Sequence, residues 1–233
     1  MKNKLPVLSF FIVFITLALT VTITYEAITK TVINSKIQNK KTIIIDAGHG
    51  GFDSGAQVAD GTHEKDINLK ISKNLKDFLE YFNFNVIMTR ETDISVESDN
   101  DKKSKKSSDL YNRLNTMKEN PDAIFVSIHM NKFTSSNAVG AQVFYAPKVP
   151  MSDLLADSIQ STIKQLLQPQ NERVIKKGTK SIYILNNATI PATIVECGFM
   201  SNQKELSLLK DENYQKKMAF SILCGIISYH NSF

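Results

Sequence analysis

Residues 41–55, KTIIIDAGHGGFDSG, place an apolar run directly before a glycine-rich turn. The three isoleucines at 43–45 are β-branched and predict a short buried strand. The glycines that follow let the backbone turn sharply, and His49 lies among them with no bulky neighbour over its ring. A histidine presented in this way suits metal ligation or catalysis, although an incidental surface histidine on a glycine-rich turn would give the same pattern.

Beyond this stretch, predicted helices and strands alternate along the chain. The helix expected at 64–82 has the clearest pattern, because its apolar residues recur at spacings of three and four. Such alternation predicts an α/β fold, a single domain in which helices flank both faces of a mostly parallel central sheet. The other expected elements are strands at 84–90, 123–128, 140–146, 181–185 and 193–195, and helices at 109–119 and 152–167, after Asn202 and across 218–227.

Polar residues follow or end three of the predicted strands. His49 follows the first strand, His129 ends the run AIFVSI, and Glu196 ends the run TIV. Because ligands bind outside the carboxyl ends of the strands in parallel sheets, we expect these three side chains to meet at one rim. Glu64 opens a helix soon after the His49 turn, and its carboxylate could reach the same rim.

Two histidines and one carboxylate form a ligand set that zinc hydrolases use, with a fourth position left to water. A second carboxylate is then needed as a base, and Glu64 and Glu196 supply one residue for each role. The H-E-x-x-H helix is absent, because position 67 is isoleucine. From the residues alone, the choice between His63 and Glu64 as a ligand stays open.

Composition limits the classes of protein that fit. At 233 residues and 42% hydrophobic content, the chain accommodates one good-sized domain plus an appendage. Its net charge of +5 suits anionic surroundings such as a membrane surface or a cell-wall polymer, and no basic run interleaved with aromatics points to nucleic acid. Cys197 and Cys224 have neither metal-ligand spacing nor a disulfide framework, so we expect buried free thiols.

The first 28 residues have the pattern of a signal anchor or signal peptide. Two lysines precede an uncharged apolar run at about 6–25, which is long enough to cross a bilayer and keeps the positive charge on the cytoplasmic side. Because the run is long and no A-x-A cleavage site follows it, an uncleaved anchor is favoured. This interpretation predicts a membrane segment at 1–28, a basic linker at 29–40 and an extracytoplasmic domain at 41–233.

A charged, serine-rich stretch, ESDNDKKSKKSS at 97–108, separates two of the predicted elements. A run of charges of this kind is usually solvated, and we expect a surface loop here. Its four lysines, at positions 102, 103, 105 and 106, could also contact an anionic partner.

Four ordered segments carry a resemblance to a known family. IDAGHGGFDSGA, EKDINL, SIHMN and VECGFMSN resemble the signature segments of the zinc-dependent N-acetylmuramoyl-L-alanine amidases, the amidase-3 family, and the likeness covers nearly everything from Thr42 onward. The basic stretch before DLYNRLN and the ending that begins IPATIVECGFMSN are most similar to the spore-cortex amidases of endospore formers. Ser54 departs from the proline that the family often holds, at a position that supplies no needed group.

The resemblance implies residue roles that the pattern alone left open. It implies a Zn²⁺ cofactor held by His49, Glu64 and His129. Glu196 matches the catalytic glutamate of the family, whereas His63 matches no ligand. Arg90 and Arg113 match positions that the family commonly holds as arginine, where we expect either substrate contact or a structural ion pair.

The activity implied by the resemblance is hydrolysis of the amide between the lactyl group of N-acetylmuramic acid and the L-alanine of the stem peptide in peptidoglycan. In the spore cortex this cleavage prepares the muramic lactam needed for germination, so the expected location is the extracytoplasmic forespore cortex space. The implied partners are the glycan strand with its stem peptide, the membrane through the N-terminal segment, and an accessory protein that the sequence does not identify. Two alternatives stay open: a non-catalytic peptidoglycan-binding regulator, and another zinc hydrolase of the wall, a peptidase or deacetylase.

Overall fold

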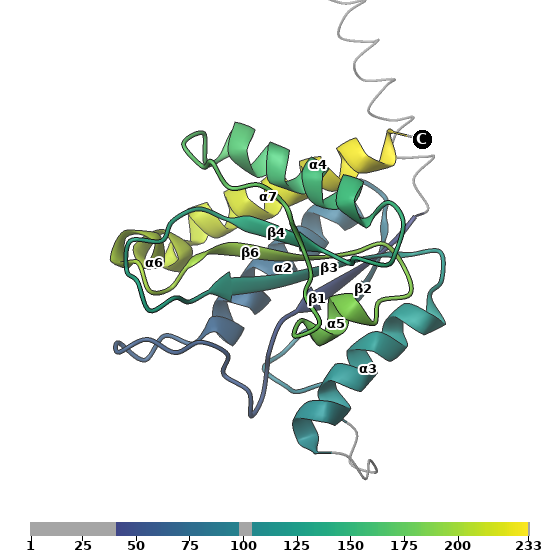
Figure 1. Cartoon of the computed structure of the whole chain (residues 1–233), viewed down its shortest axis with the longest axis horizontal. Coiled ribbons are helices and arrows are strands. Elements are labelled where there is room, and N and C mark those ends of the chain that lie inside the picture. The colour runs from purple at the N-terminus through teal and green to yellow at the C-terminus, as the bar shows by residue number, and fades with distance from the viewer. Residues whose placement is uncertain (1–40, 98–103, 233) are drawn as a thin grey trace, which may run out of the picture. The chain divides into compact units, whose positions relative to one another are not determined.

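The structure, a computed structural model, describes residues 41–97 and 104–232 (Figure 1). The predicted membrane segment at 1–28 and linker at 29–40 lie outside these residues, as do two of the loop lysines, at 102 and 103. Across the described ranges, no helix combines the length and the apolar character that crossing a bilayer requires. The residues from Lys41 onward form one compact unit, as predicted for a single domain.

A sheet lies at the centre of this unit. Counted over the described residues, it has six strands: β1 (Thr42–Ala47), β2 (Asn85–Met88), β3 (Ile124–Asn131), β4 (Gln142–Tyr145), β5 (Lys176–Lys177) and β6 (Ala192–Phe199). They lie in the order β2-β1-β3-β6-β4-β5 (Figure 1). The first four in this order run parallel, β4 pairs antiparallel with β6, and β5 pairs parallel with β4. The prediction of a mostly parallel sheet is confirmed, with a reversed pair at one edge.

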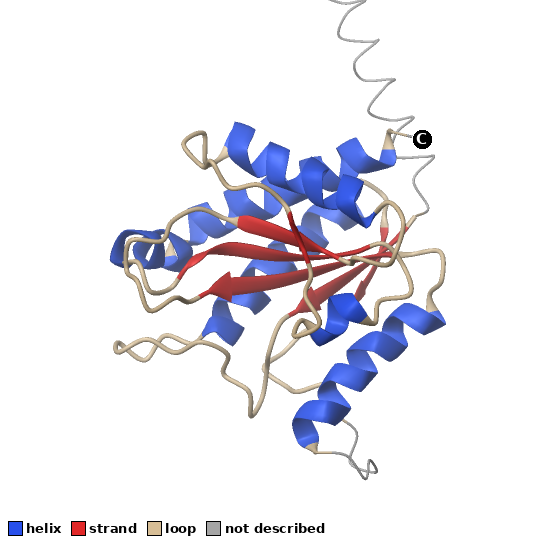
Figure 2. Ribbon diagram, viewed as in Figure 1, coloured by secondary structure: helices blue, strands red, loops and turns tan. Residues whose placement is uncertain are grey.

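Helices cover both faces of the sheet, as predicted (Figure 2). One face packs against α2 (Glu64–Tyr81), α4 (Ser152–Leu166), α6 (Gln203–Lys210) and α7 (Glu212–His230). The other face packs against α3 (Lys105–Glu119) and the short α5 (Tyr183–Asn186). Alternate residues of β1 enter the two cores: Ile43 and Ile45 lie in the larger core under α2, and Ile44 lies in the core under α3. Burial on both faces explains the continuous apolar run with which the domain begins.

Helix α2 follows the predicted periodicity. Ile67, Ile71, Leu75 and Leu79 recur at spacings of four on its inner face, and each is at most 3% exposed. Burial of each such side chain contributes about 1.5–3 kcal/mol. This apolar face therefore holds α2, and with it Glu64 in the first turn, firmly against the sheet.

The predicted strand at 181–185 is wrong, because this part of the chain forms α5 instead. A short apolar run does not distinguish a strand from a buried helical turn by its periodicity. Ile184 and Leu185 both enter the core beneath α3, whereas consecutive residues of a strand would point to opposite faces.

Residues 105–108 of the predicted loop are helical, so the helix predicted from Asp109 begins earlier, at Lys105. Ser104 caps this helix, because its hydroxyl accepts a hydrogen bond of 3.3 Å from the backbone N–H of Ser107. The charged run thus enters α3, and its last two lysines lie in the first turn of the helix.

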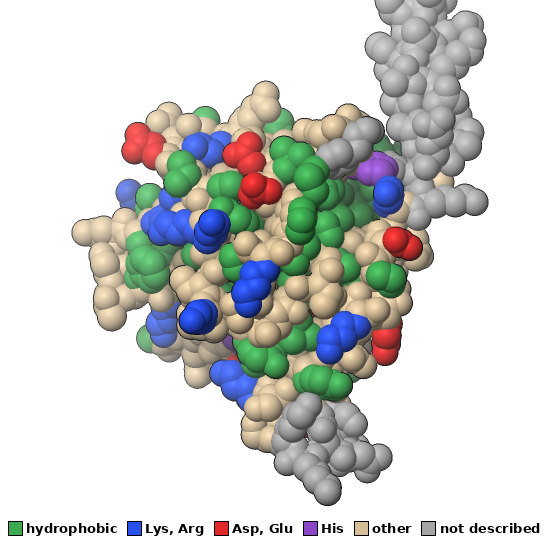
Figure 3. All heavy atoms as spheres, turned by 45° about the vertical axis from the view of Figure 1, so that its right-hand side comes forward, with side chains coloured by type: hydrophobic (Ala, Val, Ile, Leu, Met, Phe, Trp, Pro, Cys, Tyr) green, Lys and Arg blue, Asp and Glu red, His purple; other side chains and the backbone are tan. Residues whose placement is uncertain are grey.

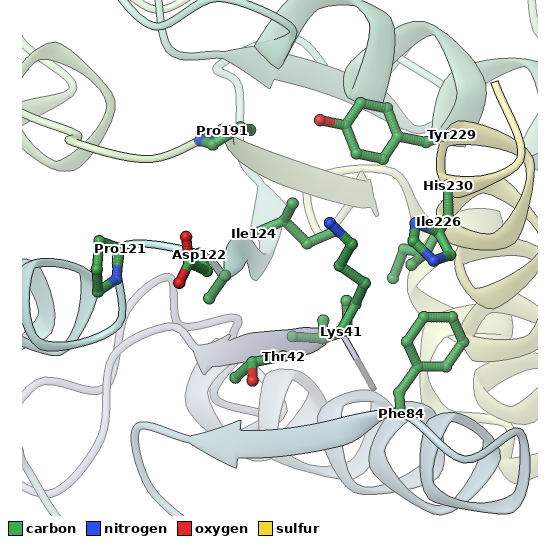
Figure 4. Close-up of a pocket in the computed structure, with 12 residues that line it drawn as sticks. Lys41, Thr42, Phe84, Pro121, Asp122, Ile124, Pro191, Ile226, Tyr229 and His230 are labelled. Atoms are coloured by element: carbon green, nitrogen blue, oxygen red, sulfur yellow. The ribbon is translucent and has the colours of Figure 1, made fainter. Parts of the chain in front are cut away.

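A cavity of about 180 Å³ lies at the amino ends of the parallel strands (Figure 4). Lys41, directly before β1, and Ile124, at the start of β3, line it together with Tyr229 and His230 at the end of α7. In Figure 4 the Lys41 side chain reaches into this space. Because sheets of this class bind ligands at the carboxyl ends of their strands, the cavity lies away from the expected site.

The face drawn in Figure 3 carries lysine and arginine side chains that are scattered among polar and apolar atoms. They are not gathered into one block on this face. The net charge of +5 itself favours general attraction to anionic surroundings.

Candidate metal centre and active site

Three of the predicted site residues meet at the carboxyl ends of the strands. One ligand atom from each of His49, Glu64 and His129 lies within 4.8 Å of the other two. The two imidazole centroids are 4.8 Å apart in an edge-to-face arrangement. His63 lies outside this group, and its Nδ1 faces Asp66 Oδ2 at 4.0 Å. Of the two candidates that the sequence left open, the structure therefore brings Glu64 to the histidines.

A strained turn presents His49. Its φ of 60° lies in the left-handed region, which costs a non-glycine residue about 1–3 kcal/mol. Gly50, with a φ of 133°, can adopt its conformation because it has no Cβ. Gly50 and Asp53 close the turn by exchanging backbone hydrogen bonds of 2.9 and 3.1 Å. The conformation persists only because the surrounding structure holds it.

Two buried arginines hold the backbone of this turn. Arg90 donates to the carbonyl oxygens of Ala47 and Gly48 at 2.9 and 3.0 Å. Arg113 donates to the carbonyl oxygens of Ala47 and His49 at 3.1 and 2.9 Å. These contacts direct both guanidinium groups at the chain itself and give them a structural role beneath the turn.

Arg113 also belongs to a buried ion-pair network at the end of β1. Asp46 pairs with Arg113 and accepts hydrogen bonds from Thr89 Oγ1 at 2.8 Å and Ser127 Oγ at 2.6 Å. Asp109 pairs with the Arg113 Nε at 2.7 Å. Burial alone would raise the pKa of Asp46, but the guanidinium and the two hydroxyls lower it. The sequence analysis missed both aspartates, although Asp46 ends the isoleucine run, where a buried charge requires a partner.

Both histidines of the group direct a ring nitrogen at the same oxygen of Glu64. His49 Nε2 and His129 Nδ1 lie 3.2 and 3.0 Å from Glu64 Oε1. On the far side of its ring, His49 Nδ1 lies 2.9 Å from Asp53 Oδ2, an arrangement that orients a metal-binding imidazole and raises its basicity. The sequence analysis missed Asp53, which stands four residues after His49 on the same turn.

Backbone hydrogen bonds fix the carboxylate of Glu64. Its own N–H donates to the carbonyl oxygen of Ala56, and the N–H of Ala56 donates to Glu64 Oε2, both at 2.8 Å. The N–H of Met130 donates to Oε1 at 3.0 Å. Because the side chain is only 5% exposed, Glu64 presents its carboxylate to the histidines in one orientation.

The electrostatics of the group fit a divalent cation. Burial alone would lower the pKa of His49, but hydrogen bonds and charges from Glu64 and Asp53 raise it to about 9. Burial would raise the pKa of Glu64, but the two imidazoles hold it well below its usual range. The buried carboxylate of Glu64 thus calls for positive charge beside it, which a bound divalent cation would supply. Two imidazoles with one carboxylate are a donor set that suits zinc.

Glu196 lies beside this group on the neighbouring strand. In the pairing of β3 with β6 it stands opposite His129, so both side chains point to the same face of the sheet. Its Oε2 is buried and has no hydrogen-bond partner among the described residues. Burial raises the pKa of Glu196 to about 7; the charge of Glu64 adds to this effect, and the two histidines oppose it. A carboxylate with these properties can accept a proton near neutral pH.

His129 and Glu196 lie within their strands, so the predicted strand ends at 128 and 195 are wrong. Strand β3 continues to Asn131, and β6 continues to Phe199. A polar side chain does not end a strand when it faces a cleft and its backbone stays paired. The predicted convergence at one rim is nevertheless confirmed for the two histidines and Glu64.

A cleft of about 100 Å³ adjoins the metal-binding group on the α3 face of the sheet. His49 and His129 line it, and Leu110, Ile184 and Ile194 supply apolar surface from α3, α5 and β6. Through this cleft a ligand can reach His49 and His129 while it contacts the apolar side chains on the opposite wall.

Comparisons with known proteins agree with this site. The amidase-3 family, described as N-acetylmuramoyl-L-alanine amidase, matches residues 43–228. The germination-specific N-acetylmuramoyl-L-alanine amidase of Bacillus subtilis is 36% identical over 191 residues, covering 81% of this chain and 79% of that protein.

Solved structures extend the similarity to the fold. The CwlD amidase from Clostridioides difficile, solved in complex with the GerS lipoprotein, is 41% identical, with a TM-score of 0.79 over 83% of this chain and 100% of that one. The amidase AmiC2 of Nostoc punctiforme is 30% identical, with a TM-score of 0.71 over 83% of this chain and 98% of that one. Since the family match spans nearly all of the described domain and the relatives share both sequence and fold with it, this chain belongs to the amidase-3 family of N-acetylmuramoyl-L-alanine amidases.

Proposed function

We propose that the protein hydrolyses the amide bond between the lactyl group of N-acetylmuramic acid and the L-alanine of the peptidoglycan stem peptide. The observation that carries this proposal is the position of Glu196. It stands opposite His129 of the metal-binding group, and its Oε2 has no hydrogen-bond partner among the described residues. A metal-capable group next to a carboxylate that can accept a proton is the combination that metal-assisted hydrolysis requires. Family membership supports the choice of bond.

The proposed cofactor is zinc. His49 Nε2, Glu64 Oε1 and His129 Nδ1 would hold it, because these three atoms face one another. Asp53 keeps the ring of His49 in the orientation that presents Nε2. Bound zinc supplies a nucleophile from water at neutral pH and polarises the scissile carbonyl.

Glu196 is the proposed general base and acid. It takes a proton from the attacking water and then gives that proton to the leaving amine of L-alanine. Burial raises the pKa of Glu196 and so favours its holding the proton between the two transfers. Pairing on both sides of β6 fixes the backbone of Glu196 opposite His129 on one side and Gln142 on the other.

The relatives support a role in the spore cortex. The Bacillus subtilis relative carries the name germination-specific amidase, and we infer that this chain also acts on cortex peptidoglycan and prepares the muramic lactam needed for germination. The Clostridioides difficile relative was solved with a lipoprotein, which supports an accessory protein for this chain as well. The proposed location is extracytoplasmic, at a membrane reached through the N-terminal segment.

Digestion of purified peptidoglycan tests the proposal. We expect release of stem peptides that begin with L-alanine, complete loss of that release on chelation, and recovery when zinc is added. Mass spectrometry of the products measures the result. Loss of acetate alone would identify a deacetylase, cleavage within the stem a peptidase, and unchanged but bound polymer a binding module. Full activity in a verified metal-free preparation would exclude zinc catalysis.

Gly48→Ala should weaken zinc binding about 10- to 100-fold, the range found when support of a metal ligand is lost. A Cβ at this position would lie 2.3 Å from His129 Nε2 and 2.4 Å from Cε1, so the ring of His129 would have to move. Competition with a coloured chelator measures the affinity. The control is Gly61→Ala, which adds the same methyl group at a position whose Cβ meets nothing within 4 Å, although its φ of 85° makes that substitution strained in its own right. Equal zinc affinity in both variants would contradict the expectation.

The predicted anchor implies that a reporter fused after Phe233 lies outside the cytoplasm. Alkaline phosphatase in this position should be active, and removal of residues 1–28 should leave it inactive in the cytoplasm. Enzyme activity in intact cells, normalised to the amount of fusion protein, is the measurement. A fusion that is inactive with the full chain would count against export.

A further inference from the structure

Among the described residues, one cationic side chain that lines the cleft beside the metal-binding group makes no ion pair. The other charged side chains that line the cleft are paired with one another or with Glu64. The exception is Lys106, which is exposed in the first turn of α3 and makes no ion pair with any residue between 41–97 or 104–232. An unpaired cation at the edge of a substrate cleft is available to an anionic ligand.

The neighbouring Lys105 differs from Lys106, because its charge has partners within the protein. The Nζ of Lys105 lies 3.5 Å from Glu97 and 5.9 Å above the ring of Phe52, so that charge already has contacts within the protein. Lys106 instead lines the same cleft as His49, Asp53 and His129.

The proposed substrate carries negative charge on only one side of the bond that is cut. The sugars of the glycan strand are neutral, because the lactyl carboxyl of N-acetylmuramic acid is consumed in the amide. The stem peptide carries carboxylates, and the first belongs to the acidic residue that follows L-alanine. In an extended peptide the nitrogen of that residue lies about 5 Å from the scissile carbonyl carbon. An anion that meets Lys106 next to the reacting group must therefore come from the peptide.

We propose that Lys106 binds the α-carboxylate of the second stem-peptide residue and so determines which stem peptides the enzyme prefers. This inference rests on the proposed amidase function. It adds that the cleft selects stem peptides whose second residue carries a negative charge. Amidation of that carboxylate removes its charge and turns an acceptor of a charge-assisted hydrogen bond into a neutral amide. Amidated peptidoglycan should thus be the poorer substrate.

Two matched soluble glycan–peptide fragments test the proposal, one with a free α-carboxylate on the second residue and one with an α-carboxamide. The zinc-loaded wild type should cleave the carboxylate form with a kcat/KM about tenfold higher, the lower end of what a charged hydrogen bond contributes. Lys106→Met should lose that preference by slowing only the carboxylate form. Lys118→Met is the control, because it removes the same charge from the far end of α3, where its Nζ lies over Tyr111.

The outcomes separate this inference from the proposed function. Equal cleavage of both fragments by wild type would overturn the role of Lys106 and leave the amidase function standing. An equal loss on both fragments in Lys106→Met, or the same loss of preference in Lys118→Met, would overturn it too. Release of no peptide from either fragment by the wild type would reject the proposed function and this inference with it. Zinc content and melting temperature of both variants should match wild type.

Discussion

Glu196→Gln should keep its zinc and its fold but lose about 10²–10⁴-fold in turnover, the usual effect of removing a general base. The amide occupies nearly the same volume as the carboxylate but cannot accept a proton from water. Because Oε2 has no partner in the described structure, removing the charge breaks no ion pair and should not lower the melting temperature. Peptide release, zinc content and melting temperature are measured on the same preparation.

His129→Ala is the comparison variant. It should lose both zinc and turnover, because a site with two remaining ligands holds zinc poorly. A folded, zinc-loaded Glu196→Gln enzyme with near-wild-type turnover would remove Glu196 from the mechanism. A Glu196→Gln protein that unfolds would instead assign Glu196 a structural role.

Arg113→Leu should lower the free energy of unfolding by about 3–5 kcal/mol, the loss expected when one partner of a buried ion pair is removed. The side chains of Arg113 and Asp46 are 3% and 2% exposed, so Asp46 would be left as a charge inside the core. The carbonyl oxygens of Ala47 and His49 would lose donors at the same time. Urea unfolding monitored by circular dichroism gives the measurement.

The pH dependence gives an independent check on this ion pair. The pKa of Asp46 is lowered in the folded protein, so the stabilisation is fully present above its ordinary pKa of 3.8 and is lost as the pH falls through the folded value. The stability difference between wild type and Arg113→Leu should therefore shrink in acid. Adding Asp46→Asn to Arg113→Leu should restore part of the stability at neutral pH, because no unpaired charge remains.

Lys76→Met is the control for this series, because Lys76 pairs with Glu91 at 2.9 Å on the surface. Its unfolding should match that of the wild type within error, since exposed ion pairs contribute little. The same unfolding free energy in Arg113→Leu and wild type would show that the buried network does not stabilise the fold.

The sequence was sufficient to predict the sheet class, helix α2 and the meeting of His49, Glu64 and His129. The pattern of isoleucines at 43–45 and the helical spacing from Ile67 to Leu79 are local signals of burial, and tertiary packing preserves them. The strand that was predicted at 181–185 fails because four apolar residues have no measurable period. The pairing of Arg113 with Asp46 could not be predicted, because the two residues lie 67 positions apart in the chain.

The ends of β3 and β6 show a second limit of sequence patterns. His129 and Glu196 each interrupt an apolar run. In the sequence, a polar residue at the end of a strand cannot be told from a polar residue within a strand that continues beyond it. The roles of these residues came from the order of four motifs and not from periodicity. The turn partner Asp53 was missed because a lone aspartate among glycines is also a common surface turn residue.

The separation of the three metal-binding residues along the chain has a consequence for chain entropy. His129 and Glu64 lie 65 residues apart, so an ion that ties them together closes a long loop in the manner of a reversible cross-link. The unfolded chain does not hold these atoms together and so should not bind the ion. A free zinc concentration of 100 times Kd would therefore add about 2.7 kcal/mol to the free energy of unfolding. A bound ion would link β3 to α2, so the zinc supply would set the resistance of the domain to proteolysis as well as its activity.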